Sequence, residues 1–317
     1  MAPAAADRQG RAVETATYDV AIVGGGAAGL SAALVLGRAR RRVVVIDAGA
    51  PRNGAAANMH GYLSRDGTSP ADLIRAGREE ATGYGVEFVR DDVAAVEPGF
   101  SVQVGKAGLL EARRLLIATG ATDELPEIDG ARERWGRDFL HCPYCHGWEV
   151  RDQALAVLAT GAGSVEHAEL IRQWSTNLVF FTDTHDLPDD ERERLAALGI
   201  RIVDGDVWML VVEDDRLRGV TLADGSVIRR DAVFIRPKMR PNASGLIEQL
   251  GCDLDDLGFV RVDEAGRTSA DGVWAAGNVA NPRAQVISAA GEGSAAAISI
   301  NADLVQEDVR DALNDAR

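Results

Sequence analysis

The pattern of apolar and polar positions begins abruptly at Tyr18 and predicts a strand, a turn, a helix and a second strand. Residues 18–23 form a short apolar run, as in a strand buried on both faces of a sheet. A glycine-rich turn at 24–29 leads into an Ala- and Leu-rich stretch that we expect to be helical to about Arg40. A second apolar run covers 42–46. This βαβ order predicts an α/β protein with a Rossmann-like, doubly wound domain.

A second βαβ-like region lies further along the chain. Strands are predicted at 155–158 and 178–181, with a helix at 164–175 between them. Because C-terminal segments complete the first domain, the second Rossmann-like domain is expected to be inserted into it. The other predicted elements are a strand ending in a small-residue turn at 115–120, a strand with a polar turn at 272–279, and a helix from Ile287 to about Leu304.

Composition and charge narrow the class of protein. The chain has 317 residues, enough for two domains of about 150 residues, and its 46% hydrophobic content can fill a sizeable core. Its 34 basic and 49 acidic side chains give a net charge of −15, which argues against nucleic acid and disfavours an anionic membrane as partner. Residues 1–17 lack the apolar core of a signal peptide and are predicted to be a flexible tail. No run of about 18 uncharged apolar residues is present, so we expect a soluble, cytoplasmic protein.

The glycine-rich turn has the chemistry of a dinucleotide site. In the pattern Gly24-x-Gly26-x-x-Gly29, the first glycine permits the tight turn, the second lets the backbone approach a pyrophosphate, and the third allows helix and strand to pack closely. The helix N-terminus adds partial positive charge where the phosphates lie. Asp47 follows the second strand and can accept hydrogen bonds from the adenosine ribose. The motif predicts a dinucleotide, with a plain structural turn as the alternative, and it does not separate FAD from NAD.

Four motifs together give the chain a family resemblance: Gly24–Gly29, Ala118-Thr119-Gly120, Cys142-Pro143-Tyr144-Cys145, and Gly277-Asn278 followed by Ala289-Ala290-Gly291. From Tyr18 to about Val305 the chain resembles the low-molecular-weight thioredoxin reductases, which are flavoproteins. The resemblance implies FAD in a domain made of residues 18–121 and 239–317, and an inserted NAD(P)H-binding-like domain at 122–238 that carries the cysteines. It also implies a homodimer and a cysteine pair that lies against the isoalloxazine ring.

The same resemblance assigns the contacts to FAD. Gln285 and Val286 begin the last predicted helix, whose N-terminus would face the N1–O2 edge of the flavin and stabilise its anionic reduced form. Asn278 stands where the family usually has Asp, and its amide still suits a ribityl hydroxyl. His60 is a second-tier candidate near the flavin, with a structural loop histidine as the alternative. The implied contacts are Gly24, Gly26, Ala27, Ala28, Gly29, Asp47, Ala48, Arg52, Asn53, His60, Ala118, Thr119, Gly120, Gly277, Asn278, Gln285 and Val286.

The second predicted nucleotide loop departs from the family pattern. NADPH-dependent members have a glycine-rich loop and then a basic His-Arg-Arg cluster that holds the 2′-phosphate. Here the loop at 159–164 has Ala and Ser where that pattern has Gly and Ala, and Thr182-Asp183-Thr184 replaces the arginines. An acid there would repel a 2′-phosphate, so NADPH is disfavoured. Asp183 keeps two interpretations: a ligand to the ribose of NADH, or a solvent-facing residue in a domain that has lost nucleotide binding.

The cysteine motif departs as well. Thioredoxin reductases usually have a small polar pair between the cysteines and an Asp after the second, whereas here Pro143 and Tyr144 lie between them and His146 follows. With the altered loop, this motif resembles the dithiol oxidases that close disulfides in gliotoxin-, holomycin- and romidepsin-type natural products. Segments 51–53 and 59–63 also resemble that branch. This resemblance implies that electrons pass from a small dithiol to FAD and then to O2, which yields H2O2.

Three interpretations apply to Cys142 and Cys145: a zinc half-site, a structural disulfide and a redox pair. Zinc needs two more ligands, and His141 and His146 adjoin the pair in a turn too tight to close a tetrahedron readily. Cys252 has no partner cysteine near it and is interpreted as a small buried hydrophobe. A structural disulfide is disfavoured in a reducing cytosol. The redox pair is favoured because the flavoprotein resemblance and the Cys-x-x-Cys spacing agree, and no metal is expected.

Our mechanistic hypothesis is that a substrate thiolate attacks Cys142 in the oxidised pair, and the second substrate thiol then displaces Cys142. By family analogy, Cys145 lies nearer the flavin and passes two electrons to FAD. Thiolates attack, so a base is needed, and His146 is favoured because the unperturbed pKa of histidine is about 6.5. His141 is the reserve, and a structural role for either histidine is the alternative.

The leading hypothesis is therefore an FAD-dependent dithiol oxidase that acts on a small molecule. Tyr144 and Trp148 are candidates to wall an apolar substrate pocket, with simple packing as the alternative. One competing function is an NAD(P)H-dependent disulfide reductase acting on a thioredoxin-like protein. Another is a flavin-bound redox sensor without turnover.

Overall fold

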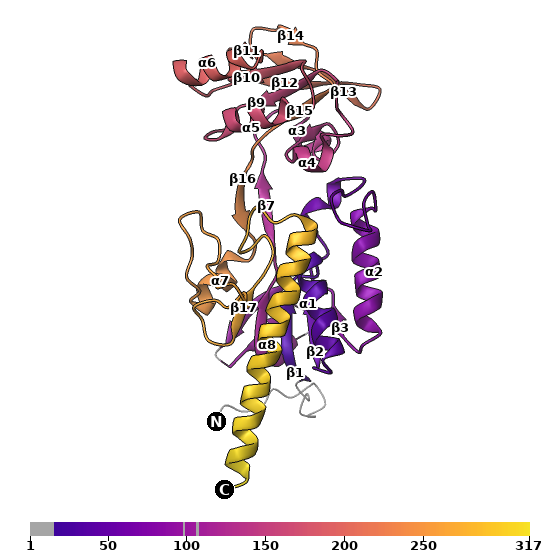
Figure 1. Ribbon diagram of the computed structural model, residues 1–317, viewed down its shortest axis with the longest axis vertical. Coiled ribbons are helices and arrows are strands. Elements are labelled where there is room, and N and C mark those ends of the chain that lie inside the picture. The colour runs from indigo at the N-terminus through magenta and orange to yellow at the C-terminus, as the bar shows by residue number, and fades with distance from the viewer. Residues whose placement is uncertain (1–15, 98, 106–107) are drawn as a thin grey trace. The chain divides into compact units, whose positions relative to one another are not determined.

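The computed structural model describes residues 16–97, 99–105 and 108–317, so residues 1–15 of the predicted tail lie outside the described part of the chain. The described residues fall into two units (Figure 1). Unit 1 comprises the described residues up to Pro51 together with Ala71–Thr122 and Arg240–Arg317. Unit 2 comprises Arg52–Pro70 and Asp123–Met239. Each unit has its own sheet and its own hydrophobic core.

The sheet of unit 1 is built around β1 (Ala16–Val23). β1 pairs in parallel with β2 (Val43–Ile46) and with β6 (Gly108–Ile117), and β6 pairs in parallel with β17 (Val273–Ala275). The outer strands are β3 (Glu87–Val89) beside β2, and the antiparallel strands β5 (Ser101–Val104) and β4 (Val93–Glu97) beyond β6.

The strands predicted in unit 1 are present, and β6 begins seven residues before its predicted start at Leu115. β1 begins two residues early and takes Ala16 and Thr17 out of the predicted tail, because these residues pair with Leu110 and Glu111 of β6. The predicted helix after the glycine turn is α1 (Ala27–Arg38).

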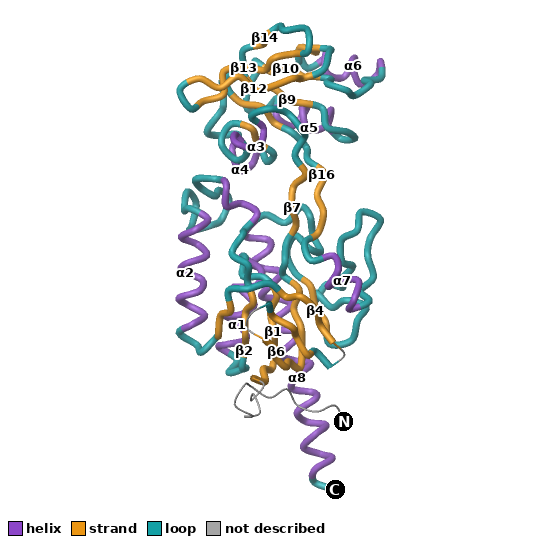
Figure 2. Tube along the Cα trace, turned by 180° about the vertical axis from the view of Figure 1, so that it is seen from behind, coloured by secondary structure: helices purple, strands orange, loops and turns teal. Residues whose placement is uncertain are grey.

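Successive residues of the strands face opposite sides of the sheet, and each side has its own core. Val20 and Ile22 of β1 pack on one side, against α1 and α8 (Val286–Asp315). The end of α2 (Pro70–Thr82) contributes to the same core. Ala21 and Val23 pack on the side of α7 (Ser244–Leu250). Figure 1 views the sheet from the α8 side, and Figure 2 shows the strands in front of α8. Burial on both sides explains why the strands appear in the sequence as unbroken apolar runs.

α8 runs eleven residues beyond its predicted end at Leu304 and finishes at Asp315. Its last turns have few buried residues, so hydrophobic periodicity gives little sign of them. Ion pairs attach this part instead: Arg41 and Arg113 both pair with Asp308. The helix end is thus fixed by long-range charge pairs.

Unit 2 contains a second parallel sheet. β9 (Leu155–Leu158) and β10 (Leu178–Phe181) have the predicted bounds, and the helix between them, α5 (Ser164–Ile171), ends four residues early. The sheet order is β11 (Arg201–Val203), β10, β9, β15 (Ala232–Phe234) and β8 (Phe139–Leu140). The remaining elements are the antiparallel strands β12 (Val207–Glu213), β13 (Arg216–Leu222) and β14 (Val227–Ile228), and the helices α3 (Ala131–Arg134), α4 (Pro143–His146) and α6 (Asp189–Ala197).

The chain passes between the units in β7 (Ala121–Glu124) and β16 (Lys238–Pro241), which pair with each other. The segment Arg52–Pro70 also groups with unit 2, whereas the sequence analysis placed it in the FAD domain. Its short helix η1 (Arg52–Ala55) is attached there by an ion pair between Arg52 and Asp123, 71 residues away in the sequence.

The fold class is confirmed: the chain is α/β and contains two Rossmann-like parallel sheets with their covering helices. None of the described helices combines the length and the apolar character that crossing a membrane requires.

We expect Gly293→Ala to lower the melting temperature. Gly293 is buried where α8 meets α1, and an added Cβ would lie 2.0 Å from the backbone oxygen of Ala28. Overpacking of this kind typically costs about 1–3 kcal/mol. Gly291→Ala is the matched control, since it lies in the same helix and no described atom stands within 4 Å of its added Cβ. Thermal unfolding followed by circular dichroism should show a lower melting temperature for Gly293→Ala only. Equal changes in melting temperature in the two variants would contradict the close contact.

Candidate functional site

Three loops of unit 1 meet at the carboxyl end of β1. A Cβ on Gly24 (φ +109°) would lie 2.3 Å from the carbonyl oxygen of Ala118, which follows β6. A Cβ on Gly277 (φ +78°), which follows β17, would lie 3.0 Å from the Cβ of Ala28 in α1. Larger side chains would not fit at these positions. The predicted FAD contacts after β1, β6 and β17 are therefore neighbours in space.

The first turn of α1 is open. Gly26 is the N-cap residue with φ −78°, and a Cβ placed there would meet no described atom within 4 Å. Gly26 has no side chain to cap the N–H groups of this turn, which have no partner within the helix itself. Gly29 differs, because its Cβ would lie 1.9 Å from the oxygen of Gly24. The turn thus combines space and backbone donors in the way a pyrophosphate requires.

Asp47 is fixed beside this turn. Its Oδ1 accepts a hydrogen bond from the N–H of Gly25 (3.1 Å), and its Oδ2 pairs with Arg78 of α2. A held carboxylate at the end of β2 fits the predicted role toward the ribose hydroxyls. Arg78 is a partner that the sequence analysis missed, since no local motif marks it. Ala48, the next residue, is exposed.

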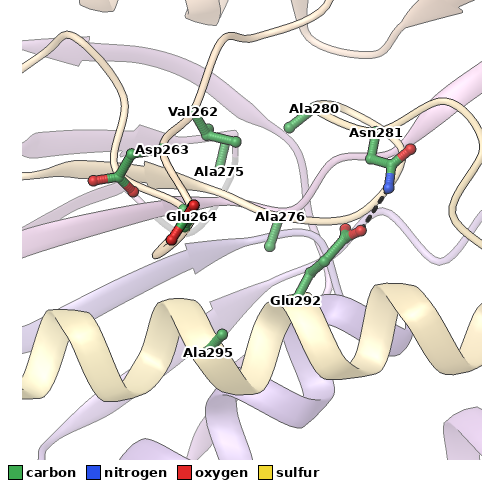
Figure 3. A pocket seen from close by; sticks show the side chains of 10 residues that line it. Val262, Asp263, Glu264, Ala275, Ala276, Ala280, Asn281, Glu292 and Ala295 are labelled. Carbon is green, nitrogen blue, oxygen red and sulfur yellow. Dashed lines mark hydrogen bonds between the residues drawn. The ribbon is translucent and has the colours of Figure 1, made fainter.

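Asn278 and Glu292 shape the loop between β17 and α8. The side-chain amide of Asn278 donates to two backbone oxygens within the loop, that of Asn281 at 3.0 Å and that of Ala284 at 3.1 Å. Glu292 accepts from the N–H of Gly277 (2.9 Å) and from the side chain of Asn281 (2.7 Å; Figure 3). The loop is thereby fixed up to Gln285, the N-cap residue of α8.

A hollow of about 200 Å³ lies beside this loop (Figure 3). Its lining consists mainly of small residues and the acids Asp263, Glu264 and Glu292. None of the predicted FAD contacts lines it. An acidic lining does not suit a pyrophosphate, so this hollow is separate from the candidate site.

Cys142 and Cys145 form a disulfide in unit 2, with Cα atoms 5.2 Å apart. Cys142 follows β8 as the N-cap residue of α4, and Pro143 takes the first helical position, where a missing N–H costs nothing. Gly147 ends the turn, because a Cβ there would lie 2.5 Å from the Pro143 oxygen and 2.8 Å from the ring of Trp174. The local sequence therefore holds both sulfurs on one short turn, as a Cys-x-x-Cys redox pair requires.

His146 directly follows the pair, and both of its ring nitrogens are buried. Neither makes a hydrogen bond within the described part of the chain. Burial lowers the pKa of His146 below its usual value of 6.5, and the backbone of Cys142 and the carboxylate of Glu149 oppose this only in part. The imidazole is thus neutral at pH 7 and able to accept a proton.

His60 belongs to unit 2 and lies between two carboxylates. Its Nε2 is 3.5 Å from Glu149 and its Nδ1 is 3.3 Å from Asp66. His60 and Glu149 both act electrostatically on His146. These contacts connect His60 to the surroundings of the redox pair. Glu149 is a further residue that the sequence analysis missed, because nothing in its spacing relates it to His60.

His141, the residue before the pair, lies against Arg52. Arg52 donates two hydrogen bonds to the carboxylate of Asp123, from Nε at 2.8 Å and from Nη2 at 2.6 Å. The same Nη2 is 3.4 Å from Nδ1 of His141, and the ring of His167 lies 6.0 Å from the His141 ring. Burial, and after it the charge of Arg52, holds the pKa of His141 well below 6.5. His141 is therefore neutral at pH 7.

The second predicted nucleotide loop is bonded by side chains of its own unit. The hydroxyl of Ser164 accepts from the N–H of Thr160 (3.1 Å) and donates to the oxygen of Gly161 (2.7 Å). Arg236 donates to the oxygen of Gly163 (3.3 Å), and a Cβ on Gly163 would lie 1.6 Å from that guanidinium nitrogen. Gly161, which corresponds to Gly26 in the first turn, also has no described atom within 4 Å of an added Cβ, so the loop departs from the pattern at Ser164 but keeps space at Gly161.

Asp183 also has a structural partner. Its Oδ1 accepts a hydrogen bond from the N–H of Val207 at the start of β12 (2.8 Å), with Asp183 itself at φ +48°. The carboxylate thus joins the end of β10 to β12. This use differs from both interpretations given above, a nucleotide ligand and a solvent-facing residue.

The aromatic residues near the cysteines are exposed. Tyr144 and Trp148 are each 67% exposed, and their role as walls of a substrate pocket stays a prediction. Tyr144 meets the ring of Trp174 edge-on at 5.7 Å, and Arg151 stacks over Trp148 at 4.0 Å. Cys252 is buried, which raises the pKa of its thiol and agrees with its interpretation as a small hydrophobe.

Comparison with known proteins identifies the family. Residues 18–293 match the pyridine nucleotide-disulphide oxidoreductase family. The chain belongs to this family. The thioredoxin reductase sirT of Leptosphaeria maculans is 31% identical over 309 residues, which cover 90% of this chain and 93% of that protein. The thioredoxin reductase tcpT of Claviceps purpurea is 31% identical over 82% of this chain and 86% of its own length.

Solved structures are similar to this oxidoreductase over nearly its whole length. The crystal structure of HlmI has 50% sequence identity and a TM-score of 0.92, and the match covers 99% of this chain and 98% of HlmI. The putative thioredoxin reductase TrxB from Bacillus anthracis has 34% identity and a TM-score of 0.87, over 92% and 99% of the two chains. The resemblance to thioredoxin reductases is confirmed, and the protein is an FAD-dependent thiol/disulfide oxidoreductase.

The residues present in unit 1 of the oxidoreductase fit FAD. The open first turn of α1 suits the pyrophosphate, and Asp47 suits the ribose. Thr119 and Gly120 are held by Asn242, which bonds the Thr119 oxygen through its amide (2.9 Å) and the Gly120 oxygen through its backbone N–H (3.0 Å). The predicted contacts Arg52, Asn53 and His60 lie instead in unit 2, and whether they touch FAD stays a prediction.

We expect Gly26→Val to weaken FAD binding without unfolding the oxidoreductase. The backbone at Gly26 is compatible with any residue, yet the new side chain would fill the space required by the pyrophosphate. The dissociation constant for FAD should rise at least about tenfold, or about 1.4 kcal/mol. Gly245→Val in α7 is the control, because it also has open space around its Cβ. Flavin content and titration of the apoprotein give the measurement, and equal affinities in both variants would show that FAD binds elsewhere.

Proposed function

We propose that this oxidoreductase is a dithiol oxidase, which converts a small-molecule dithiol to a disulfide and passes the electrons through FAD to O2. The observation that carries the proposal is Asp183 at the end of β10, where enzymes of this kind that take electrons from NADPH have arginines for the 2′-phosphate. The Asp183 carboxylate is used within unit 2, where it accepts a hydrogen bond from the N–H of Val207. A dithiol oxidase needs the turn at Gly26, which is open, and needs no site for a 2′-phosphate.

The first step is an exchange at Cys142. His146 accepts the proton of one substrate thiol, and the resulting thiolate attacks Sγ of Cys142. A bond forms between the substrate sulfur and Cys142, the Cys142–Cys145 bond breaks, and Cys145 leaves as a thiolate. The buried, neutral imidazole of His146 suits this proton transfer because it has no competing hydrogen bond among the described residues.

The second step releases the product. The other substrate thiol gives its proton to the Cys145 thiolate and attacks the substrate sulfur bound to Cys142. The substrate disulfide forms, and Cys142 leaves as a thiolate that takes the proton held by His146. One dithiol is oxidised and one cysteine disulfide is reduced, so two electrons and two protons are transferred. FAD, when bound, supplies the two-electron acceptor that returns the cysteines to the disulfide, with O2 reduced to H2O2 as the final acceptor.

The proposal extends to the domains and the assembly. Residues 18–121 and 239–317 would bind FAD and 122–238 would carry the redox pair, which is supported by the glycine turns in unit 1 and the cysteines in unit 2. A homodimer is supported by apolar side chains exposed along α8, such as Ile298 (62%) and Leu313 (59%). A cytoplasmic location is supported by the low cysteine count, which suits a reducing compartment.

A disulfide reductase is the second candidate. It is favoured by the relatives that are named thioredoxin reductase. Such an enzyme would take electrons from NADH or NADPH and reduce a thioredoxin-like protein through the same cysteine pair. A redox sensor, which would need the pair and FAD without turnover, is the third.

Anaerobic mixing should separate these functions. We expect dithiothreitol to bleach the flavin absorbance and NADH and NADPH to leave it unchanged, because the proposed oxidase takes its electrons from a dithiol. Cys142→Ser and Cys145→Ser should abolish dithiol-dependent oxygen consumption, and Cys252→Ser should retain it. Rapid bleaching by either nucleotide would contradict the oxidase and support a reductase. Bleaching by dithiol without catalytic oxygen consumption would support the sensor.

The role of His146 should appear in the pH profile. Since burial lowers its pKa, the imidazole stays unprotonated to below pH 6.5, and the acid limb of kcat/KM should lie below that value. His146→Gln should lower kcat/KM by about 10²–10⁴-fold near neutral pH, with a smaller loss at high pH, where the substrate thiols ionise unaided. His185→Gln, in the turn after β10, is the control. A profile unchanged by His146→Gln would assign the base to another group.

A further inference from the structure

Arg52, Asp123, His141 and His167 form a cluster beside the redox pair that the exchange steps above do not use. The side chain of Asp123 is only 7% exposed and that of Arg52 is 24% exposed. His167 is 92% buried, and its Nε2 has no hydrogen-bond partner in the described segments. Burial of a charged pair is costly unless the pairing is good, and here two hydrogen bonds join the partners.

The chemistry of the guanidinium fixes the roles within this cluster. Arginine has five N–H donors and no acceptor. The Nε and Nη2 groups of Arg52 donate to Asp123, which sets the plane of the guanidinium. Nη2 carries a second N–H, which is shared between Nδ1 of His141 (3.4 Å) and the sulfur of Met239 (3.5 Å). Nδ1 of His141 can therefore only accept, and the single proton of the neutral ring must be on Nε2.

The surroundings of His141 disfavour its charged form. Burial acts first, and Arg52, Arg236 and His146 act in the same direction. Asp123 opposes these effects and favours an imidazolium, but its carboxylate is already paired with Arg52. His167 packs against the ring from α5 and is itself held neutral by burial, with its pKa lowered to about 4. The groups that face His141 thus keep its ring neutral, and the contact with Arg52 sets the tautomer of that neutral ring.

We propose that Arg52, anchored by Asp123, holds His141 as a neutral Nε2–H donor beside Cys142 and thereby excludes it from acting as the base. Arg52 and Asp123 are positioning residues in this arrangement, and His146 is left as the proton acceptor. One consequence rests on the proposed function: Cys142 leaves as a thiolate when the product disulfide forms, and a neighbouring N–H donor would stabilise that charge. The tautomer itself does not depend on the function.

Nitrogen-15 NMR of histidine-labelled, FAD-loaded protein tests the tautomer directly. The five histidines can be assigned with single His→Gln variants. We expect His141 to carry its proton on Nε2 and to show no titration between pH 5.5 and 8. In Arg52→Gln, the pKa of His141 should rise by about one unit or more, because a cation is removed and Asp123 is left unpaired. Arg151→Gln, which removes an arginine stacked on Trp148, should leave His141 unchanged.

Two results of this measurement would overturn the proposal. One is a wild-type His141 with its proton on Nδ1 or with an ordinary titration near pH 6.5. The other is an Arg52→Gln variant whose His141 spectrum equals that of the wild type. The wild-type spectrum alone decides the question if Arg52→Gln does not fold. Neither result depends on dithiol oxidation, so failure of the proposed function is distinguishable from failure of this inference.

Substitution of His141 separates a donor from a base. Glutamine keeps an N–H donor but cannot take up a proton, whereas leucine does neither. The measurement is the rate of anaerobic flavin reduction by dithiothreitol. In His141→Gln this rate should stay within about threefold of the wild-type rate. In His141→Leu it should fall about tenfold or more, the scale of one hydrogen bond to a charged group. Equal losses in the two variants would contradict the donor role.

Discussion

The close approach of backbone to backbone at the carboxyl end of β1 is the constraint on which the rest of unit 1 depends. Gly24 meets the Ala118 carbonyl, Gly29 meets Gly24, and Gly277 and Gly293 both meet Ala28. A methyl group at any of these contacts would push the loops or α1 and α8 apart. The first turn of α1 is left open because its neighbours are this small, and the fit to FAD follows from it.

The two glycine turns of the chain share a scaffold and differ in their side chains. Each follows a strand of a parallel sheet and precedes a helix. In one, a glycine at the N-cap leaves the helix donors and the space before them available. In the other, Ser164 bonds the loop internally and Arg236 bonds the oxygen of Gly163, while Gly161 stays open. The difference lies in a few side chains and leaves the fold intact, so function must be argued from the site.

The strands and the local motifs could be predicted from the sequence. The features that could not be predicted are all contacts between residues far apart in the chain. Strands such as β9 and β10 are buried on both faces, so each appears as an unbroken apolar run with clear ends. The glycine turn and the Cys-x-x-Cys motif are likewise local. The partners Arg52 and Asp123, or His60 and Glu149, are brought together only by the tertiary fold, and no period or motif relates them. The extension of α8 belongs to the same class, since distant arginines hold it.

The hydrogen bond from Val207 to Asp183 limits which residues can stand at position 183, where an arginine would favour the 2′-phosphate of NADPH. An arginine placed at this position to attract a 2′-phosphate would remove the acceptor for β12 and would occupy a left-handed backbone conformation that favours Asp. The antiparallel sheet would lose an anchor before any nucleotide could bind. An Asp183→Arg substitution made to favour a 2′-phosphate would therefore also lower the stability of unit 2, because this one carboxylate already has a structural use.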